Sequence, residues 1–231
     1  MRVISFSLWG TDPKYTVGAL RNAELAPTIY AGWRCRFHCA TSVPREVIER
    51  LQEMAHVEVV AMPEPGDWRA VFWRFYPAAD PAVTVMLSRD TDSRLTARER
   101  AAVEEWLASD KDFHVVRDHP EHTATILGGM WGVRNGLLRD IRALIDAYPG
   151  GDFWQVDQQF LDAVVAPRVR DHWLEHDEYY AGKQFPTRRV ARDFVGQPFD
   201  ALDRPLILGP SRLRRTLSRA RIRLRRLRAR R

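Results

Sequence analysis

The length and composition of the chain favour a globular protein with a large core. Of its 231 residues, 45% are apolar and 10% are aromatic, which is enough for one large domain. The sequence contains no run of 18 or more apolar residues, and Gly10, Asp12 and Pro13 interrupt its apolar opening segment. These features argue against a membrane-spanning helix and an ordinary secretion signal, so we expect a cytoplasmic protein.

The charge of the chain is concentrated at one end. The formal net charge is +6, but residues 212–231 contain 11 arginines and no acid, which leaves residues 1–211 with 25 basic against 30 acidic side chains. The body is therefore mildly acidic, and only the terminal segment suggests a polyanionic partner. We expect a domain over residues 1–210 and a basic tail over residues 211–231.

The first part of the chain alternates strand and helix patterns. Strands are expected over residues 3–8, 34–40 and 57–62, and helices over residues 15–26 and 42–54. Cys35 and Cys39, the two cysteines, lie in the second strand, about 13 Å apart by strand geometry. That separation excludes a local disulfide and argues against a zinc pair, so both are expected to be buried in the core.

The rest of the chain continues the alternation. A short aromatic helix is expected over residues 68–76, a strand over 83–87, a helix over 96–108, extended segments over 114–117 and 126–133, and helices over 137–147 and 156–165. Residues 168–210 have a weak pattern, which suggests a segment that packs over the sheet edge. Regular alternation predicts the α/β class, with a mostly parallel sheet covered by helices on both faces.

Two acids stand where the apolar strand over residues 83–87 ends. In an extended chain, side chains at i and i+2 share one face about 6 to 7 Å apart, so Asp90 and Asp92 can converge on one hard cation. Ligands of open α/β sheets bind beyond the carboxyl ends of the strands, which is where this pair falls. The alternative is a polar strand end whose acids cap the next helix or pair with Arg89 and Arg94.

This segment resembles the GT-A glycosyltransferases, in which an apolar strand ends in an Asp-x-Asp motif after a helix that carries an arginine. Here the corresponding stretches are residues 72–77, with Arg74, and residues 83–92. The resemblance implies a Rossmann-like GT-A fold, a nucleoside diphosphate sugar donor with UDP-sugars favoured, and Mn²⁺ or Mg²⁺ held by Asp90 and Asp92. It also implies that Arg74 reaches the donor phosphate or sugar. Ser88 and Arg89 depart from the pattern, because those families more often keep apolar residues up to the first aspartate.

The first strand supports the nucleotide in that fold. The resemblance therefore makes Ser5, Ser7, Trp9 and Tyr15 candidates to hold the base and ribose, with Trp9 and Tyr15 stacking on the base. Trp9 is equally explained as a core aromatic residue at a strand end.

A second cluster runs from Arg117 to Gly132. Gly128 and Gly129 permit the close backbone approach that a sugar or diphosphate requires, although the pair can equally form a bulge. Trp131 is a further substrate-binding candidate. His119 is a candidate third metal ligand or sugar contact, and a structural histidine is the alternative. Asp118 is the expected base if the reaction inverts the sugar.

A third cluster contains Asp157 and Gln158. It resembles the Asp-Gln element that touches the donor sugar in some retaining GT-A enzymes, and the resemblance makes both residues candidates to stabilise or orient the reacting sugar. Asp157 also lies at an expected helix start, where an acid caps the backbone.

The tail carries an apolar stripe among its arginines. Leu213, Leu217, Ala220, Leu224 and Leu227 recur at steps of three and four, which is typical of one face of a helix. An anionic membrane surface would bury this stripe and neutralise the charge. A nucleic-acid arm would use the same arginines but has no need of the leucines, so nucleic acid is the less favoured partner.

Taken together, these patterns lead us to expect a metal-dependent, hexosyltransferase-like enzyme. It would pass a sugar from a nucleoside diphosphate sugar to a glycan or lipid-linked glycan at the cytoplasmic face of a membrane, to which it binds peripherally. The alternatives are a nucleotidyl or phosphoryl transferase of α/β fold, and a non-catalytic adaptor that binds membrane or RNA through the tail.

Overall fold

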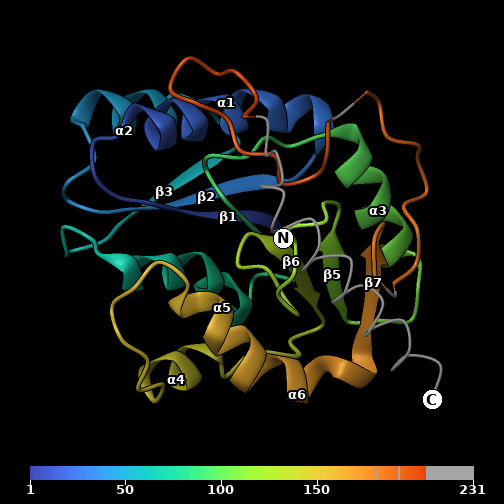
Figure 1. Cartoon of the computed structure of the whole chain (residues 1–231). Helices are drawn as coiled ribbons and strands as arrows, with labels where there is room; N and C mark the ends of the chain where they lie inside the picture. Colours follow the sequence, from blue (N-terminus) through green and yellow to red (C-terminus); the bar gives the residue numbers. More distant parts are fainter. Residues whose placement is uncertain (181, 192, 207–231) are drawn as a thin grey trace, which may run out of the picture.

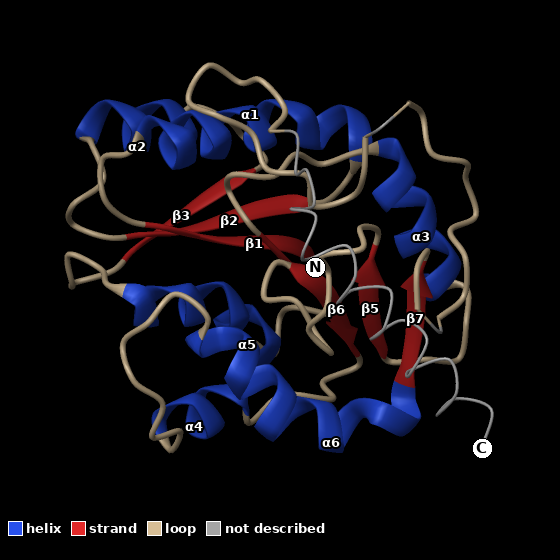
Figure 2. Ribbon diagram, in the orientation of Figure 1, coloured by secondary structure: helices blue, strands red, loops and turns tan. Residues whose placement is uncertain are grey.

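The computed structural model describes residues 1–180, 182–191 and 193–206. In this part of the chain a seven-stranded sheet has the order β3-β2-β1-β4-β6-β5-β7 (Figure 1). The strands are β1 (Arg2–Leu8), β2 (Arg34–Cys39), β3 (Val57–Ala61), β4 (Val85–Arg89), β5 (Phe113–Arg117), β6 (Met130–Arg134) and β7 (Trp173–Asp177). Helices cover both faces (Figure 2), so the expected α/β class is confirmed.

The first four strands are parallel and lie as the alternation predicted. β1 pairs with β2 on one side and with β4 on the other, with Ile4 opposite both Cys35 and Leu87. Residues 3–8 of β1 are buried on both faces, as a central parallel strand requires. The helices between these strands are α1 (Pro13–Ile29), α2 (Arg45–Gln52) and the 3₁₀ helix η1 (Trp68–Ala79). Asp12 caps α1 by accepting a hydrogen bond from the Lys14 backbone N–H at 2.9 Å.

The second half adds an antiparallel strand to the sheet. β6 pairs antiparallel with both β4 and β5, whereas β7 is parallel to β5, so β6 is the one reversed strand in the described part of the sheet. The sheet is therefore mostly parallel, as expected. The remaining helical segments are α3 (Ala97–Leu107), α4 (Ile141–Asp146), α5 (Val156–Phe160), the π-helical turn η2 (Leu161–Val165), α6 (Ala166–Val169) and η3 (Arg170–His172).

Two apolar cores lie on opposite faces of the sheet. One packs α1 and α2 against β1 and β2 and contains Tyr30, Phe37 and Trp106, all fully buried. The other packs η1 and α4 to α6 against the opposite face and contains Phe75 and Trp131. In Figure 1, α1 and α2 lie above the sheet and η1, α4, α5 and α6 lie below it. This sandwich leaves the loops at the strand ends free to form a site.

Several boundaries differ from the expected ones. The extended segment expected from residue 126 becomes a strand only at Met130, because residues 126–129 form a loop. The helix expected over residues 137–147 is confined to Ile141–Asp146. Strand β7 was not expected, because its sequence Trp-Leu-Glu-His-Asp lacks the alternation of a half-buried strand.

The basic tail expected over residues 211–231 lies outside the described residues. No helix in the described ranges is both long and apolar enough to cross a bilayer.

Candidate functional site

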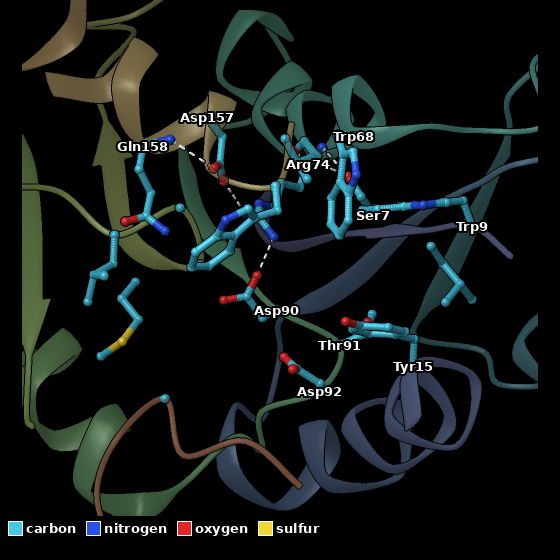
Figure 3. A pocket seen from close by; sticks show the side chains of 18 of the residues that line it. Ser7, Trp9, Tyr15, Trp68, Arg74, Asp90, Thr91, Asp92, Asp157 and Gln158 are labelled. Atoms are coloured by element: carbon cyan, nitrogen blue, oxygen red, sulfur yellow. Dashed lines mark hydrogen bonds and ion pairs between the residues drawn. The ribbon is translucent and has the colours of Figure 1, made fainter. Parts of the chain in front are cut away.

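A cavity of about 560 Å³ opens at the carboxyl ends of β1 and β4 (Figure 3). Loops after these two strands form its floor, and η1, α5 and the loop before β6 form its walls. Ten of the residues that the sequence singled out line it: Ser7, Trp9, Tyr15, Arg74, Asp90, Asp92, Gly128, Gly129, Asp157 and Gln158. The fold therefore brings together side chains from five separate stretches of the chain.

The two acids follow β4 directly. Asp90 comes immediately after Arg89, the last residue of β4, and Asp92 lies two residues further along a turn. The Asp92 carboxylate pairs with the Lys14 ammonium at 2.6 Å. Burial and the neighbouring charge of Asp90 raise the pKa of Asp92, although Lys14 lowers it in part. The Asp92 side chain is 20% exposed and that of Asp90 is 42% exposed, so both carboxylates can present negative charge to a cation that enters from solvent.

Arg74 joins the acids from two different elements. It lies on η1 with a buried guanidinium, which forms ion pairs with Asp90 on one side and with Asp157 of α5 on the other, the latter at 2.5 Å. Its backbone N–H donates to the Ser7 hydroxyl at 2.9 Å. Burial alone would lower the pKa of Arg74, but the charges of Asp90 and Asp157 raise it, so the guanidinium stays charged. Burial raises the pKa of Asp157, and Arg74 opposes that shift.

The two glycines before β6 pack directly against this ionic cluster. A Cβ atom on Gly128 would overlap the Asp157 carboxylate and the Arg74 guanidinium, and one on Gly129 would overlap the Asp90 carboxylate. The Gly128 carbonyl is fixed by the Ser88 hydroxyl, which donates to it at 2.6 Å. The close approach expected at these glycines is thus an approach to the site acids themselves.

An aromatic wall faces the acids. The rings of Trp9 and Trp68 meet edge to face with centroids 6.2 Å apart, and the Lys14 ammonium lies 5.0 Å from the Tyr15 ring centroid. Trp68 was not singled out in the sequence, where it appeared only as the first residue of an aromatic helix. His122 and Trp154 also line the cavity and were likewise not among the candidates.

Comparison with known proteins shows the fold. No protein-family model matches the chain, and no curated protein matches its sequence. Among solved structures, it is similar to a glycosyltransferase involved in the glycosylation of the major capsid of PBCV-1, with a TM-score of 0.52 and 16% identity over 77% of this chain and 82% of that one. It is also similar to the mannosyltransferase PcManGT from Pyrobaculum calidifontis in complex with GDP-Man and Mn²⁺, with a TM-score of 0.52 and 13% identity over 77% of this chain.

A third similar structure is residues 1–349 of TarS from S. aureus, with a TM-score of 0.50 and 12% identity over 77% of this chain. The chain has the GT-A fold. It spans 56% of the mannosyltransferase chain and 58% of the TarS chain. At these identities the similarity establishes the fold alone.

Four of the residues expected to act in a GT-A site lie outside the cavity. Asp118 is fully buried, where it accepts hydrogen bonds from Arg98 at 2.9 Å, Arg189 at 2.8 Å and the Val195 backbone N–H at 2.9 Å. Burial by itself raises the pKa of Asp118, but the hydrogen bonds from Arg98 and Arg189 lower it overall. Asp118 therefore holds a later segment in place, and its carboxylate is not available as the base that the sequence suggested.

The other three belong to the packing around the site. Trp131 is fully buried and stacks on Phe113 with centroids 5.3 Å apart, so it is a core residue. His119 packs against Phe194 at 4.3 Å, and His122 reaches the cavity in its place. Ser5 is fully buried in β1.

The charges around the cavity are unbalanced. Among the described residues that line it, four carboxylates (Asp12, Asp90, Asp92 and Asp157) face one guanidinium, that of Arg74. Burial lowers the pKa of His122 to about 3, so this histidine adds no positive charge at neutral pH. Lys14 beside Asp92 is the next nearest cation. The cavity thus has a net negative charge.

The donor atoms present suit a hard divalent cation. The described residues include no group of three or more histidine, cysteine, aspartate or glutamate side chains arranged to hold a metal. Asp90 and Asp92 nevertheless supply carboxylate oxygens at one cavity edge, which are the ligands that Mg²⁺ and Mn²⁺ prefer. A cation with two protein carboxylates completes its coordination with water and phosphate oxygens.

Proposed function

We propose that the protein is a metal-dependent glycosyltransferase whose donor is a nucleoside diphosphate sugar. The observation that carries this proposal is the meeting of an acidic pair, a buried arginine and an aromatic wall in one cavity of a GT-A fold. Each of these suits a different part of such a donor: the phosphates, the sugar and the base.

The order in which these groups line the cavity supports one orientation of the donor. The base stacks among Trp9, Tyr15 and Trp68, because aromatic faces bind any nucleobase. The diphosphate lies at Asp90 and Asp92 with its cation. The sugar then lies toward Asp157 and Gln158, which stand on the opposite side of Arg74 from Trp9 in Figure 3.

The charge of the cavity supports the requirement for a metal. A diphosphate that enters a site lined by four carboxylates is repelled unless a cation accompanies it. Asp90 and Asp92 would hold Mn²⁺ or Mg²⁺, which neutralises the departing diphosphate when bound. The similar mannosyltransferase is a complex with GDP-Man and Mn²⁺, which is consistent with this assignment.

Asp157 and Gln158 are the residues proposed to act on the reacting sugar. As the bond from C1 to the diphosphate breaks, positive charge develops on the sugar ring, and a buried carboxylate beside it stabilises that charge. Arg74 holds the Asp157 carboxylate in place at 2.5 Å. Because Asp118 is engaged elsewhere, the residue expected as the base for inversion is absent from the cavity lining, which favours retention.

The acceptor is proposed to be a glycan or a lipid-linked glycan near an anionic membrane surface. The support is the basic tail, whose leucine stripe and arginines suit such a surface. A cytoplasmic, peripheral location follows from the same proposal.

A donor screen tests the proposed function. Purified protein is titrated by calorimetry with UDP-, GDP- and CMP-sugars and with plain nucleoside triphosphates, each with and without manganese. The proposal predicts manganese-dependent binding of at least one nucleotide sugar, with slow release of its nucleotide. Preference for plain triphosphates would instead indicate a nucleotidyl or phosphoryl transferase, and absence of any nucleotide binding would indicate a non-catalytic adaptor.

A further inference from the structure

Trp154 is the most exposed aromatic side chain that lines the cavity. Its exposed fraction is 61%, compared with 44% for Trp68, and both stand at the cavity wall. Within the described ranges, no other ring and no cation packs against its indole, and it belongs to neither large apolar core. A tryptophan side chain is normally buried or packs over other apolar groups, so its exposure at a cavity suggests that a ligand packs against it.

The loop that carries Trp154 is fixed to the opposite wall of the cavity. The Asp152 carboxylate accepts a hydrogen bond from the Trp68 backbone N–H at 2.9 Å, and the Gly150 carbonyl accepts one from the Arg69 guanidinium at 2.6 Å. These bonds tie residues 150–152 to the start of η1. Trp154 therefore stands on a segment that is anchored on one side by η1 and on the other by α5.

Trp154 lies between a loop that is hydrogen-bonded to Trp68 and the start of α5. Trp9 and Tyr15 lie on one side of Arg74, whereas Asp157 and Gln158 lie on the other (Figure 3). Trp154 precedes Asp157 by three residues, so it stands beside the end where the donor sugar is placed. Its exposed indole is therefore available at this end of the cavity lining.

We propose that Trp154 is the stacking platform for the acceptor and that the acceptor is a pyranoside, which deepens the proposed function and depends on it. A pyranose ring presents an apolar face of C–H groups and a rim of hydroxyls. The indole suits the face, and the polar side chain of Gln158, which also lines the cavity, suits the rim. An acyl chain would need a contiguous apolar patch, whereas the apolar neighbours of this ring in the sequence, Phe153 and Val156, pack into the core, and Asp152 and Gln155 are polar.

The transfer balances with this acceptor. One hydroxyl oxygen of the pyranoside on Trp154 forms the new bond to C1 of the donor sugar. The bond between C1 and the diphosphate oxygen breaks, and the hydroxyl proton leaves with the nucleoside diphosphate. No oxidant, reductant or further reactant is required.

Saturation-transfer NMR with methyl glycosides tests this proposal directly. Wild-type protein, Trp154→Ala and Trp154→Phe are each saturated in the presence of UDP, manganese and the methyl glycosides of glucose, galactose, mannose and N-acetylglucosamine. At least one glycoside should receive saturation from the wild type, lose it with Trp154→Ala and keep it with Trp154→Phe. Leu202→Ala, which alters an exposed apolar side chain outside the cavity lining, is the matched control and should retain the wild-type signal.

The same variants give a kinetic test once a donor is known. The acceptor KM of Trp154→Ala should rise about tenfold, corresponding to about 1.4 kcal/mol, with a smaller change in kcat. Circular dichroism confirms that the variant is folded. Failure of the proposed function appears separately, as absence of nucleotide-sugar binding by the wild type.

Two results would overturn the acceptor proposal. One is glycoside binding that is absent from the wild type or equal in Trp154→Ala. The other is a blue shift of the tryptophan emission on addition of phosphatidylglycerol vesicles. If Trp154→Ala abolishes this shift and glycosides do not affect it, the ring binds a lipid surface.

Discussion

Arg74 is the residue on which the geometry of the cavity depends most. Its buried guanidinium is the common partner of Asp90, which directly follows β4, and Asp157, which lies on α5. Without it, the buried Asp157 carboxylate would lose its cation, and the partly exposed Asp90 carboxylate would lose the charge that holds it in place. Removing one side chain of a buried ion pair lowers the free energy of unfolding by more than the pair contributes to it, because the remaining charged side chain stays buried without a partner.

Replacing Arg74 with methionine should therefore both destabilise the protein and weaken donor binding. We expect the free energy of unfolding to fall by about 3 to 5 kcal/mol in urea titrations, and the donor KM to rise or kcat to fall. Arg45→Met is the matched control, because Arg45 pairs with Glu49 on an exposed helix face, and its loss should cost about 0.5 kcal/mol or less. If Arg74→Met has the stability and kinetics of the wild type, Arg74 contributes only to packing and not to the ionic cluster or to donor binding.

Gly129 is a second residue whose identity the site requires. An added methyl group would overlap the Asp90 carboxylate, so Gly129→Ala should displace that side chain and reduce manganese-dependent donor affinity by at least about tenfold. Gly151→Ala is the control, because a Cβ there meets only Phe153 at an ordinary 3.8 Å. Calorimetry on both variants makes the comparison, and equal affinities would show that Asp90 does not contribute to donor binding.

The site residues that the sequence indicated correctly stand next to a segment whose own pattern predicts its secondary structure. Asp90 and Asp92 follow a strand that is evident from its apolar run, and both line the cavity, although Asp92 lies in a turn and not in the extended chain that the i, i+2 argument assumed. Asp118 also follows a strand, β5, but Arg189 and Val195 cover it, more than 70 residues away in sequence. No local pattern contains that information, which explains why the expected base is a buried structural acid.

At the scale of elements, periodicity predicted the segments with strong apolar patterns. β1 to β4 and the helices between them are buried on regular faces, and their expected positions agree with the structure. β7 is held by its parallel pairing with β5, where Trp173 lies opposite Phe113, and its sequence has no alternation to reveal it. Strands defined by their partners rather than by their own pattern are the ones that sequence analysis misses.

The tail is the element whose role rests on sequence alone. Deleting residues 212–231 should release the protein from phosphatidylglycerol vesicles in a flotation assay, while the hydrolysis of a soluble donor persists.

A matched tail variant separates charge from the apolar stripe. Replacing Leu213, Leu217, Leu224 and Leu227 with serine keeps all 11 arginines, and it should weaken flotation at physiological salt. If the deleted protein still floats, the tail is not the anchor. Flotation that is unchanged by the serine variant would leave charge alone as the cause.

At the scale of the whole molecule, buried histidines link stability to pH. Burial lowers the pKa of His38 and of His176 to about 4 and that of His114 well below its usual value. In the unfolded chain these groups titrate near 6.5, so below that pH the unfolded state binds protons that the folded state does not. The stability is therefore fully present above pH 6.5 and declines as the pH falls toward about 4.

We accordingly expect the free energy of unfolding to fall by about 2 kcal/mol or more between about pH 7 and about pH 5.5. Urea titrations at the two pH values measure it. His38→Gln should reduce this difference, because it removes one of the buried groups. Equal stability at both pH values would contradict the assignment of these histidines as buried and neutral.

At the scale of the whole cavity, we propose that a divalent cation at Asp90 and Asp92 admits a nucleoside diphosphate to a site that is otherwise too negative for it. Diffraction from crystals soaked with UDP and manganese, recorded at the manganese absorption edge, tests it most directly. We expect an anomalous peak between the two carboxylates, in contact with the diphosphate, and no such peak in Asp92→Asn. A diphosphate bound without a peak there, or with the peak elsewhere, would contradict it.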